Sequence, residues 1–212
     1  TRQTMNMKTL RLLPLSLLGL LALGACSHSS NEFTAEGTIS DAAGKTLYLE
    51  TTDTDEPQLI DSVTLDEKGR FRFRREAHSY PAFYRLRLGE SFIPFAADSV
   101  THLTLSASGK DLFSTYKIES GDEANKQIRE IGQLRTATDK AIEAILTQLN
   151  NGTLDRGVAL ARIDSLSTQL KNTLTSKYIF KDPKGAAAYY ALFQSYLGGT
   201  YFSIDHPGDD RA

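Results

Sequence analysis

The hydrophobic pattern of this 212-residue chain changes its period near residue 120. Before that point, apolar and polar residues alternate in short runs, as in 70–74, where two phenylalanines alternate with three arginines. A period of two is typical of a half-buried strand, because successive side chains point to opposite faces of a sheet. About eight such runs are separated by turn residues, which favours an antiparallel β-sandwich or a partly open barrel. The predicted strands are 33–39, 45–51, 59–65, 70–74, 81–88, 91–97, 101–107 and 113–119.

After residue 120 the apolar residues recur every three or four positions, which predicts amphipathic helices. Ser120 and Glu123 fit a capping box at the start of the first helix, and Asn-Asn-Gly at 150–152 ends it. The second helix is predicted over 154–178 and the third over 182–199, from an aspartate and a proline to paired glycines. The expected fold class is therefore β + α, with a sandwich followed by a three-helix segment. The second helix is expected to bury one stripe, formed by Leu160, Ile163, Leu166, Leu170 and Leu174.

The first 25 residues have the features of a secretory signal, with a basic start and an apolar run over 12–23. A membrane-spanning helix needs roughly 20 apolar residues, and this run is shorter and contains a proline and a glycine. The run ends in Leu23, Gly24, Ala25 and Cys26, which resembles a bacterial lipobox. The resemblance implies that the Cys26 thiol takes a diacylglyceryl group and that the chain is cut before it. The alternative is an ordinary signal peptide with an incidental cysteine.

This interpretation makes a lipid bilayer the first expected partner, bound through acylated Cys26. Residues 26–31 would form a polar tether, and the expected location is the cell envelope. In the Gram-negative lipoproteins that such a motif resembles, an aspartate after the cysteine often retains the protein at the inner membrane. Ser27 follows Cys26 here, so the resemblance favours the outer membrane facing the periplasm over the inner membrane.

Composition and motifs narrow the possible activities. Three of the 24 basic residues precede Cys26, so the chain from Cys26 onward carries 21 basic against 26 acidic residues, which argues against a nucleic-acid partner. A single cysteine allows no intrachain disulfide and no CxxC redox centre. The sequence also contains no G-x-S-x-G nucleophile motif and no phosphate-binding loop. The histidines, at 28, 78, 102 and 206, lack metal-ligand spacing, so we expect no metal, no cofactor and no catalytic residue.

Several short segments resemble one family when they are taken in order: 33–39, 44–49, 61–63 with 69–73, 81–84, 120–125 and 183–193. They are similar to the N-terminal domain of unknown function that precedes a thioredoxin-like domain in many Gram-negative lipoproteins. The resemblance implies a thioredoxin-like domain in cis as a second partner, although this chain lacks the CxxC of such a domain. Residues 201–212 form a polar tail, and we expect the chain to be truncated there.

Two hypotheses for function follow. The first is a membrane-anchored, non-catalytic accessory domain, residues 32–119 forming the β-domain and 120–200 the helical segment, of a periplasmic oxidoreductase-type lipoprotein. The second is a self-standing lipoprotein that binds a glycan or a peptide.

Two clusters of side chains are candidate sites. An aromatic cluster near the end could be a docking face, a ligand platform or simply part of the helix core. The arginines of two strands could form a solvated face or an anion site. The aromatic cluster is Tyr189, Tyr190, Phe193, Tyr196, Tyr201 and Phe202; the arginines are Arg70, Arg72, Arg74, Arg85 and Arg87.

Overall fold

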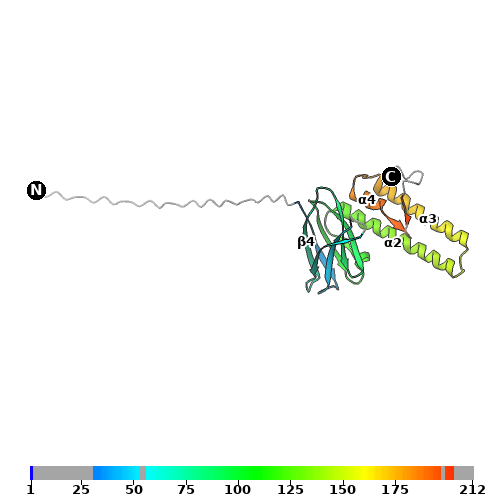
Figure 1. The fold of residues 1–212 in the computed structure, drawn as a ribbon, viewed down its shortest axis with the longest axis horizontal. Helices are drawn as coiled ribbons and strands as arrows, with labels where there is room; N and C mark the ends of the chain where they lie inside the picture. Colours follow the sequence, from blue (N-terminus) through cyan, green and yellow to red (C-terminus); the bar gives the residue numbers. More distant parts are fainter. Residues whose placement is uncertain (2–30, 53–55, 197–198, 203–212) are drawn as a thin grey trace.

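The computed structural model describes residue 1 and residues 31–52, 56–196 and 199–202. It contains a β-sandwich, followed by a helical segment that lies against one side of the sandwich (Figure 1). Among the described residues, no helix is both long and apolar enough to cross a membrane.

The sandwich consists of two four-stranded sheets. The first has the order β4 (Arg70–Glu76), β1 (Glu32–Ser40), β7 (His102–Ser108), β8 (Lys117–Ile118). The second has the order β3 (Gln58–Thr64), β2 (Thr46–Thr51), β5 (Ala82–Leu88), β6 (Ser91–Ala97). The predicted class, a sandwich of about eight strands followed by helices, is confirmed, and the sandwich is open and not a closed barrel.

One strand pair departs from the antiparallel expectation. β1 pairs with β4 antiparallel but with β7 parallel, Thr34 facing His102 and Ser40 facing Ser108. The alternation of a strand specifies which side chains are buried, but it carries no information about the neighbouring strand or its direction. The parallel pair is therefore a feature that the pattern could not supply.

Alternate residues of both sheets form the sandwich core. Phe33 of β1 is fully buried and its ring meets that of Tyr84 of β5 at a tilt, with ring centroids 4.7 Å apart. Its ring also meets Phe95 of β6 edge-on at 6.0 Å. These contacts join the two sheets, since β1 belongs to one sheet and β5 and β6 to the other.

The strand predicted over 113–119 is wrong in its first half. Residues Leu112–Thr115 form a short helix, α1, and only Lys117–Ile118 pair as β8. The Asp111 carboxylate accepts a hydrogen bond from the Ser114 backbone N–H at 3.1 Å, which caps the turn. This local hydrogen bond competes with strand pairing, and it lets Leu112 and Tyr116 both reach the core.

The helical segment begins with two long antiparallel helices, α2 (Glu123–Asn150) and α3 (Arg156–Leu174), which extend away from the sandwich as a hairpin (Figure 1). A π-helical turn, η1 (Thr175–Ile179), continues α3, and α4 (Ala186–Leu192) packs against α2 and η1. A two-residue pair, β9 (Ser195–Tyr196) and β10 (Gly199–Thr200), follows.

The predicted boundaries of two helices are wrong, at the start of α2 and at both ends of the third helix. The cap of α2 is Asp122, whose carboxylate accepts from the Asn125 N–H at 2.9 Å, and not Ser120. The third helix begins at Ala186, after a turn at 182–185, and already ends at Leu192. Both errors concern helix ends, where nearby polar residues compete for the same backbone groups.

The predicted stripe of α3 is only partly buried. Leu170 and Leu174 lie in the helical core, Ile163 and Leu166 are half-buried, and Leu160 is 55% exposed. The reason is that the tip of the hairpin projects beyond the sandwich (Figure 1), so among the described elements α3 packs mainly against α2 there.

Candidate functional site

The predicted lipidation site lies outside the described residues. Cys26 and the lipobox residues Leu23, Gly24 and Ala25 all fall in the segment 2–30. The anchor therefore stays a prediction from the sequence.

The histidines that the structure describes occupy ordinary surface positions. The His78 ring stacks on the Tyr80 ring, with centroids 4.8 Å apart. His102 Nδ1 lies 2.9 Å from the Thr34 hydroxyl oxygen. His28 and His206 lie outside the described residues, and within them no group of three or more His, Cys, Asp or Glu side chains is placed to hold a metal ion.

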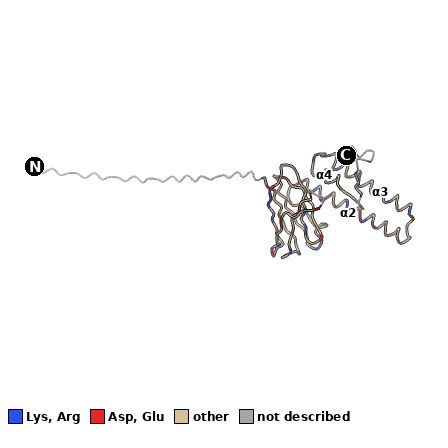
Figure 2. The backbone as a smooth tube through the Cα atoms, in the orientation of Figure 1, with Lys and Arg blue, Asp and Glu red and all other residues tan. Residues whose placement is uncertain are grey.

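The strand arginines are paired with carboxylates. In the first sheet, Arg72 pairs with Glu36 and Arg74 with Glu32 across the β1–β4 pair, and the pairs are largely exposed. Arg70 pairs with Asp66 in the adjoining turn. Figure 2 shows acidic and basic residues interspersed over the strands and along the helices. The interpretation of the strand arginines as a solvated sheet face therefore holds for Arg70, Arg72 and Arg74.

The arginines of β5 differ, because they share one buried carboxylate. Glu50 of β2 is buried, and its two carboxylate oxygens accept from Arg85 Nε at 2.5 Å and from Arg87 Nε at 2.8 Å. Burial opposes ionisation of Glu50, but the hydrogen bonds and charges of Arg87 and Arg85 outweigh it and lower the pKa of this carboxyl. The guanidinium of Arg87 also lies over the Tyr48 ring, at 4.4 Å from its centroid.

A groove runs between the second sheet and α4, and we call it the aromatic groove. Its volume is about 1100 Å³. The sheet contributes side chains from β5 and β6 and from the residues just before β5, while α4 and its flanking residues form the opposite wall. The main lining side chains are Tyr80, Phe83, Pro94, Tyr189, Tyr190 and Phe193.

The aromatic rings of this groove contact one another in a row. Phe83 stacks on Tyr189 with centroids 5.5 Å apart, and Tyr189 meets Phe193 at 4.7 Å. Tyr189 is nevertheless 54% exposed and Phe193 63% exposed. A row of exposed rings on a folded domain is typical of an interaction surface, because it leaves apolar area in water.

A smaller cavity of about 310 Å³, which we call the end cavity, shares Tyr190, Phe193 and Gln194 with the aromatic groove. Three phenylalanines line it: Phe92 of β6, Phe113 of α1 and Phe193. α2 contributes Arg135 and Thr136. The end cavity therefore combines apolar walls with one cation, Arg135, and one anion, Glu90.

Several contacts order the polar groups around the end cavity. Arg135 donates from Nη1 to Asp139 Oδ2 at 2.8 Å, one helical turn further along α2. Gln194 is buried and donates from Nε2 to the Tyr190 carbonyl oxygen at 2.8 Å. Burial raises the pKa of the Tyr190 hydroxyl, with Arg135 opposing this shift, so that Tyr190 stays a neutral hydrogen-bonding group.

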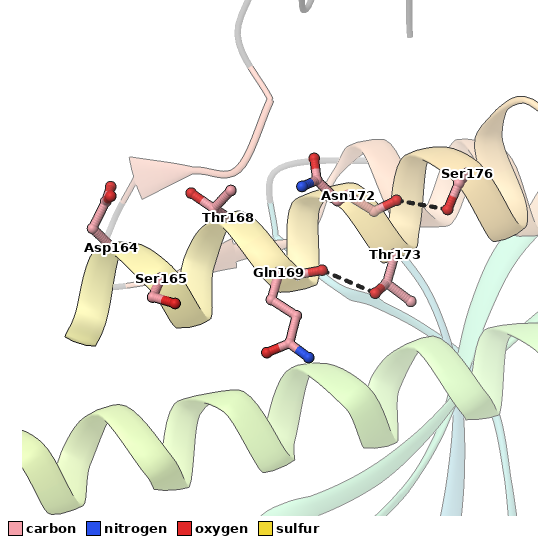
Figure 3. A pocket seen from close by; sticks show the side chains of 7 residues that line it. All are labelled: Asp164, Ser165, Thr168, Gln169, Asn172, Thr173 and Ser176. Carbon is pink, nitrogen blue, oxygen red and sulfur yellow. Dashed lines mark hydrogen bonds between the residues drawn. The ribbon is translucent and has the colours of Figure 1, made fainter. Parts of the chain in front are cut away.

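A third hollow lies on the outer side of α3 and is lined almost wholly by polar side chains (Figure 3). Two of its hydroxyls bond back to their own helix: Thr173 to the Gln169 carbonyl and Ser176 to the Asn172 carbonyl. This is the behaviour of a solvated helix face, and we assign no site to it.

The structure brings together only part of the predicted aromatic cluster. Tyr189, Tyr190 and Phe193 line the groove, whereas Phe202 is buried in the helical core with Lys171 near its ring. Tyr201 is half-buried against the same core, and the side chain of Tyr196 lies outside the described residues. Sequence reasoning missed the partners from the other elements, chiefly Phe83 and Arg135, because no periodicity links positions so far apart.

A comparison with protein families gives a match to part of the chain. Residues 33–127 match the model of a family described as Domain of unknown function (DUF4369). The matched part covers the sandwich and the first turn of α2. No curated protein matches the chain.

Proposed function

We propose that this chain is a non-catalytic interaction module of the cell envelope, anchored by lipid on Cys26, whose aromatic groove docks a thioredoxin-like domain of the same polypeptide. The observation that carries the proposal is the row of rings formed by Phe83, Tyr189 and Phe193, of which the last two are largely exposed. Contact with another domain would bury this apolar area, which a lone domain leaves in water.

The remaining parts of the proposal come from the sequence. The lipobox motif ending at Cys26 supports the anchor, and the ordered motifs over 33–193 support the thioredoxin-like neighbour. The sole cysteine is the one assigned to lipid, so any thiol chemistry would belong to the docked domain. We therefore assign no catalytic residue to the residues described.

The anchor is tested with Cys26→Ala in the bacterial host. The native protein should take up labelled fatty acid and sediment with membranes. The variant should do neither, because it lacks the thiol to be acylated. Continued labelling of the variant would refute the lipobox assignment.

The docking role is tested in two steps. First, the reading frame is extended past Ala212: a domain with CxxC between a strand and a helix supports the proposal, and a stop codon close by overturns it. Second, the double variant Tyr189→Ser/Phe193→Ser is made in the extended protein. In this variant the two domains should no longer be docked on each other. Limited proteolysis between the domains and small-angle scattering would detect their separation.

A matched control is available in Phe180→Ser. Phe180 is 56% exposed, similar to Tyr189, but it does not line either cavity. This variant should leave the proteolysis and scattering unchanged. An equal response of both variants would mean that surface hydrophobicity in general, and not the groove, is responsible.

The self-standing binder of a glycan or peptide is the second candidate, and the end cavity is the observation that favours it. Its lining of three phenylalanines and Arg135 is suited to a ligand with an apolar group and a charge. A short frame after Ala212 together with measurable ligand binding would favour this candidate over the first.

A further inference from the structure

We infer that the end cavity recognises an acidic side chain next to an aromatic one in a peptide segment, and that Arg135 binds the carboxylate. The inference rests on the proposed function, because it names the chemistry of the segment that the groove would dock. In the folded partner, such a pair would be a Glu or Asp beside a Phe, Tyr or Trp on the surface.

The shape and lining of the cavity are the first argument. Phe92, Phe113 and Phe193 surround a volume of about 310 Å³, which can hold one aromatic side chain and its backbone. The cavity shares Tyr190 and Phe193 with the larger groove, so a bound segment could continue along the row of rings.

The local backbone of α2 is part of this arrangement. A Cβ atom built on Gly132 would lie 2.9 Å from Phe113 Cζ and 3.9 Å from the Tyr190 hydroxyl oxygen. The glycine therefore lets two rings from different elements approach the helix closely. Arg135 and Thr136 lie three and four residues further on, which places them on the same face of α2 as Gly132.

The donor groups of Arg135 are the second argument. The end cavity is lined by one cation, Arg135, and one anion, Glu90, and the adjoining groove adds the cation Lys184. Arg135 has five N–H donors, and its hydrogen bond to Asp139 uses Nη1. A second carboxylate can therefore bind to the same guanidinium without displacing the first.

The test compares two labelled peptides on the purified chain by fluorescence polarisation: acetyl-Ala-Glu-Phe-Ala-amide and acetyl-Ala-Gln-Phe-Ala-amide. The two differ only by the charge of one side chain. We expect the Glu peptide to bind about tenfold more tightly, the value of one charge-assisted hydrogen bond. Arg135→Gln should abolish this preference, and Arg162→Gln on the exposed face of α3 should leave it unchanged.

A second variant separates binding from folding. Arg135→Gln leaves Asp139 without its cation, so the double variant Arg135→Gln/Asp139→Asn is measured alongside it as a neutral pair. It too should lose the preference for the Glu peptide while keeping the native thermal unfolding midpoint. Retention of the preference in both variants overturns the role of Arg135.

The outcomes distinguish this inference from the docking proposal. Equal affinity for the two peptides, abolished by Tyr189→Ser/Phe193→Ser, overturns carboxylate recognition and leaves the groove as a docking surface. Failure of both peptides to bind also overturns the inference. In that case the docking proposal is still decided by the proteolysis and scattering of the extended protein.

Discussion

Asn125 on the first turn of α2 bonds both backbone polar groups of Ala96 on β6. The Ala96 N–H donates to Asn125 Oδ1 and the Asn125 amide donates to the Ala96 carbonyl, both at 2.8 Å. β6 is an edge strand of its sheet, so the side-chain amide takes the place of a neighbouring strand. Pro94, two residues earlier, has no N–H to offer along this edge. This contact both closes the edge and fixes the helical segment to the sandwich.

We predict that Asn125→Ala destabilises the protein by about 2–3 kcal/mol, because it leaves the N–H and C=O of Ala96 buried without partners. The free energy of unfolding in urea measures this. The control is Asn172→Ala on the exposed face of α3, which should change stability by less than about 0.5 kcal/mol. Equal effects would mean that Asn125 is not the tie between the two parts.

The second prediction concerns acid stability and Glu50. Its folded pKa is held below the ordinary 4.5, so the ion pairs stabilise the fold above that value, and the stabilisation is lost as the pH falls through the lower folded pKa. Glu50→Gln should therefore cost about 1–3 kcal/mol near neutral pH, and the gap to the native protein should shrink towards about pH 3.

Urea unfolding at several pH values measures this gap. Glu36→Gln is the matched control, since Glu36 pairs with Arg72 at the exposed surface of the first sheet. It should cost less than about 0.5 kcal/mol near neutral pH. A gap for Glu50→Gln that stays constant with pH would contradict the assigned ionisation.

The third prediction compares two glycines with the same backbone conformation. Gly69 has φ of 72° and Gly44 has φ of 75°. A Cβ on Gly69 would lie 2.0 Å from the Ile39 carbonyl oxygen, whereas one on Gly44 meets no atom within 4 Å. Gly44→Ala should cost about 1–2 kcal/mol from the backbone strain alone, and Gly69→Ala should cost more than about 4 kcal/mol. Thermal unfolding distinguishes them, and similar midpoints would argue against the close approach at Ile39.

The fourth prediction concerns the two ends of the α3 stripe. Leu174 is fully buried, so Leu174→Ala should cost about 2–5 kcal/mol through the cavity that it leaves. Leu160 at the hairpin tip is 55% exposed, and Leu160→Ala should cost less than about 0.5 kcal/mol. Chemical denaturation of both variants tests whether the tip contributes to the core. A large loss for Leu160→Ala would show that another surface covers the tip.

Seven of the predicted strands agree with the structure. Six of them have buried residues on a face that alternation reveals directly, whereas β3 has no buried residue. The secondary structure of the segment around Asp111 was harder to predict, since one carboxylate hydrogen bond converts the start of a strand pattern into a helical turn. For the candidate site, the sequence alone identified Tyr189, Tyr190 and Phe193 as a cluster near the end of the chain. It offered no reason to join them with Phe83 or Arg135, which come from β5 and α2.

The sequence by itself determined the order of the alternating strands and the helices, and it predicted the lipobox at Cys26 before them, because hydrophobic period is a local property of the chain. Only the tertiary structure decided that β1 runs parallel to β7, that Glu50 is shared by two arginines, and that the rings of α4 lie opposite Phe83. These relationships join residues far apart in the chain. They depend on how sheets and helices pack, and strand pairing and packing leave no periodic signature in either partner alone.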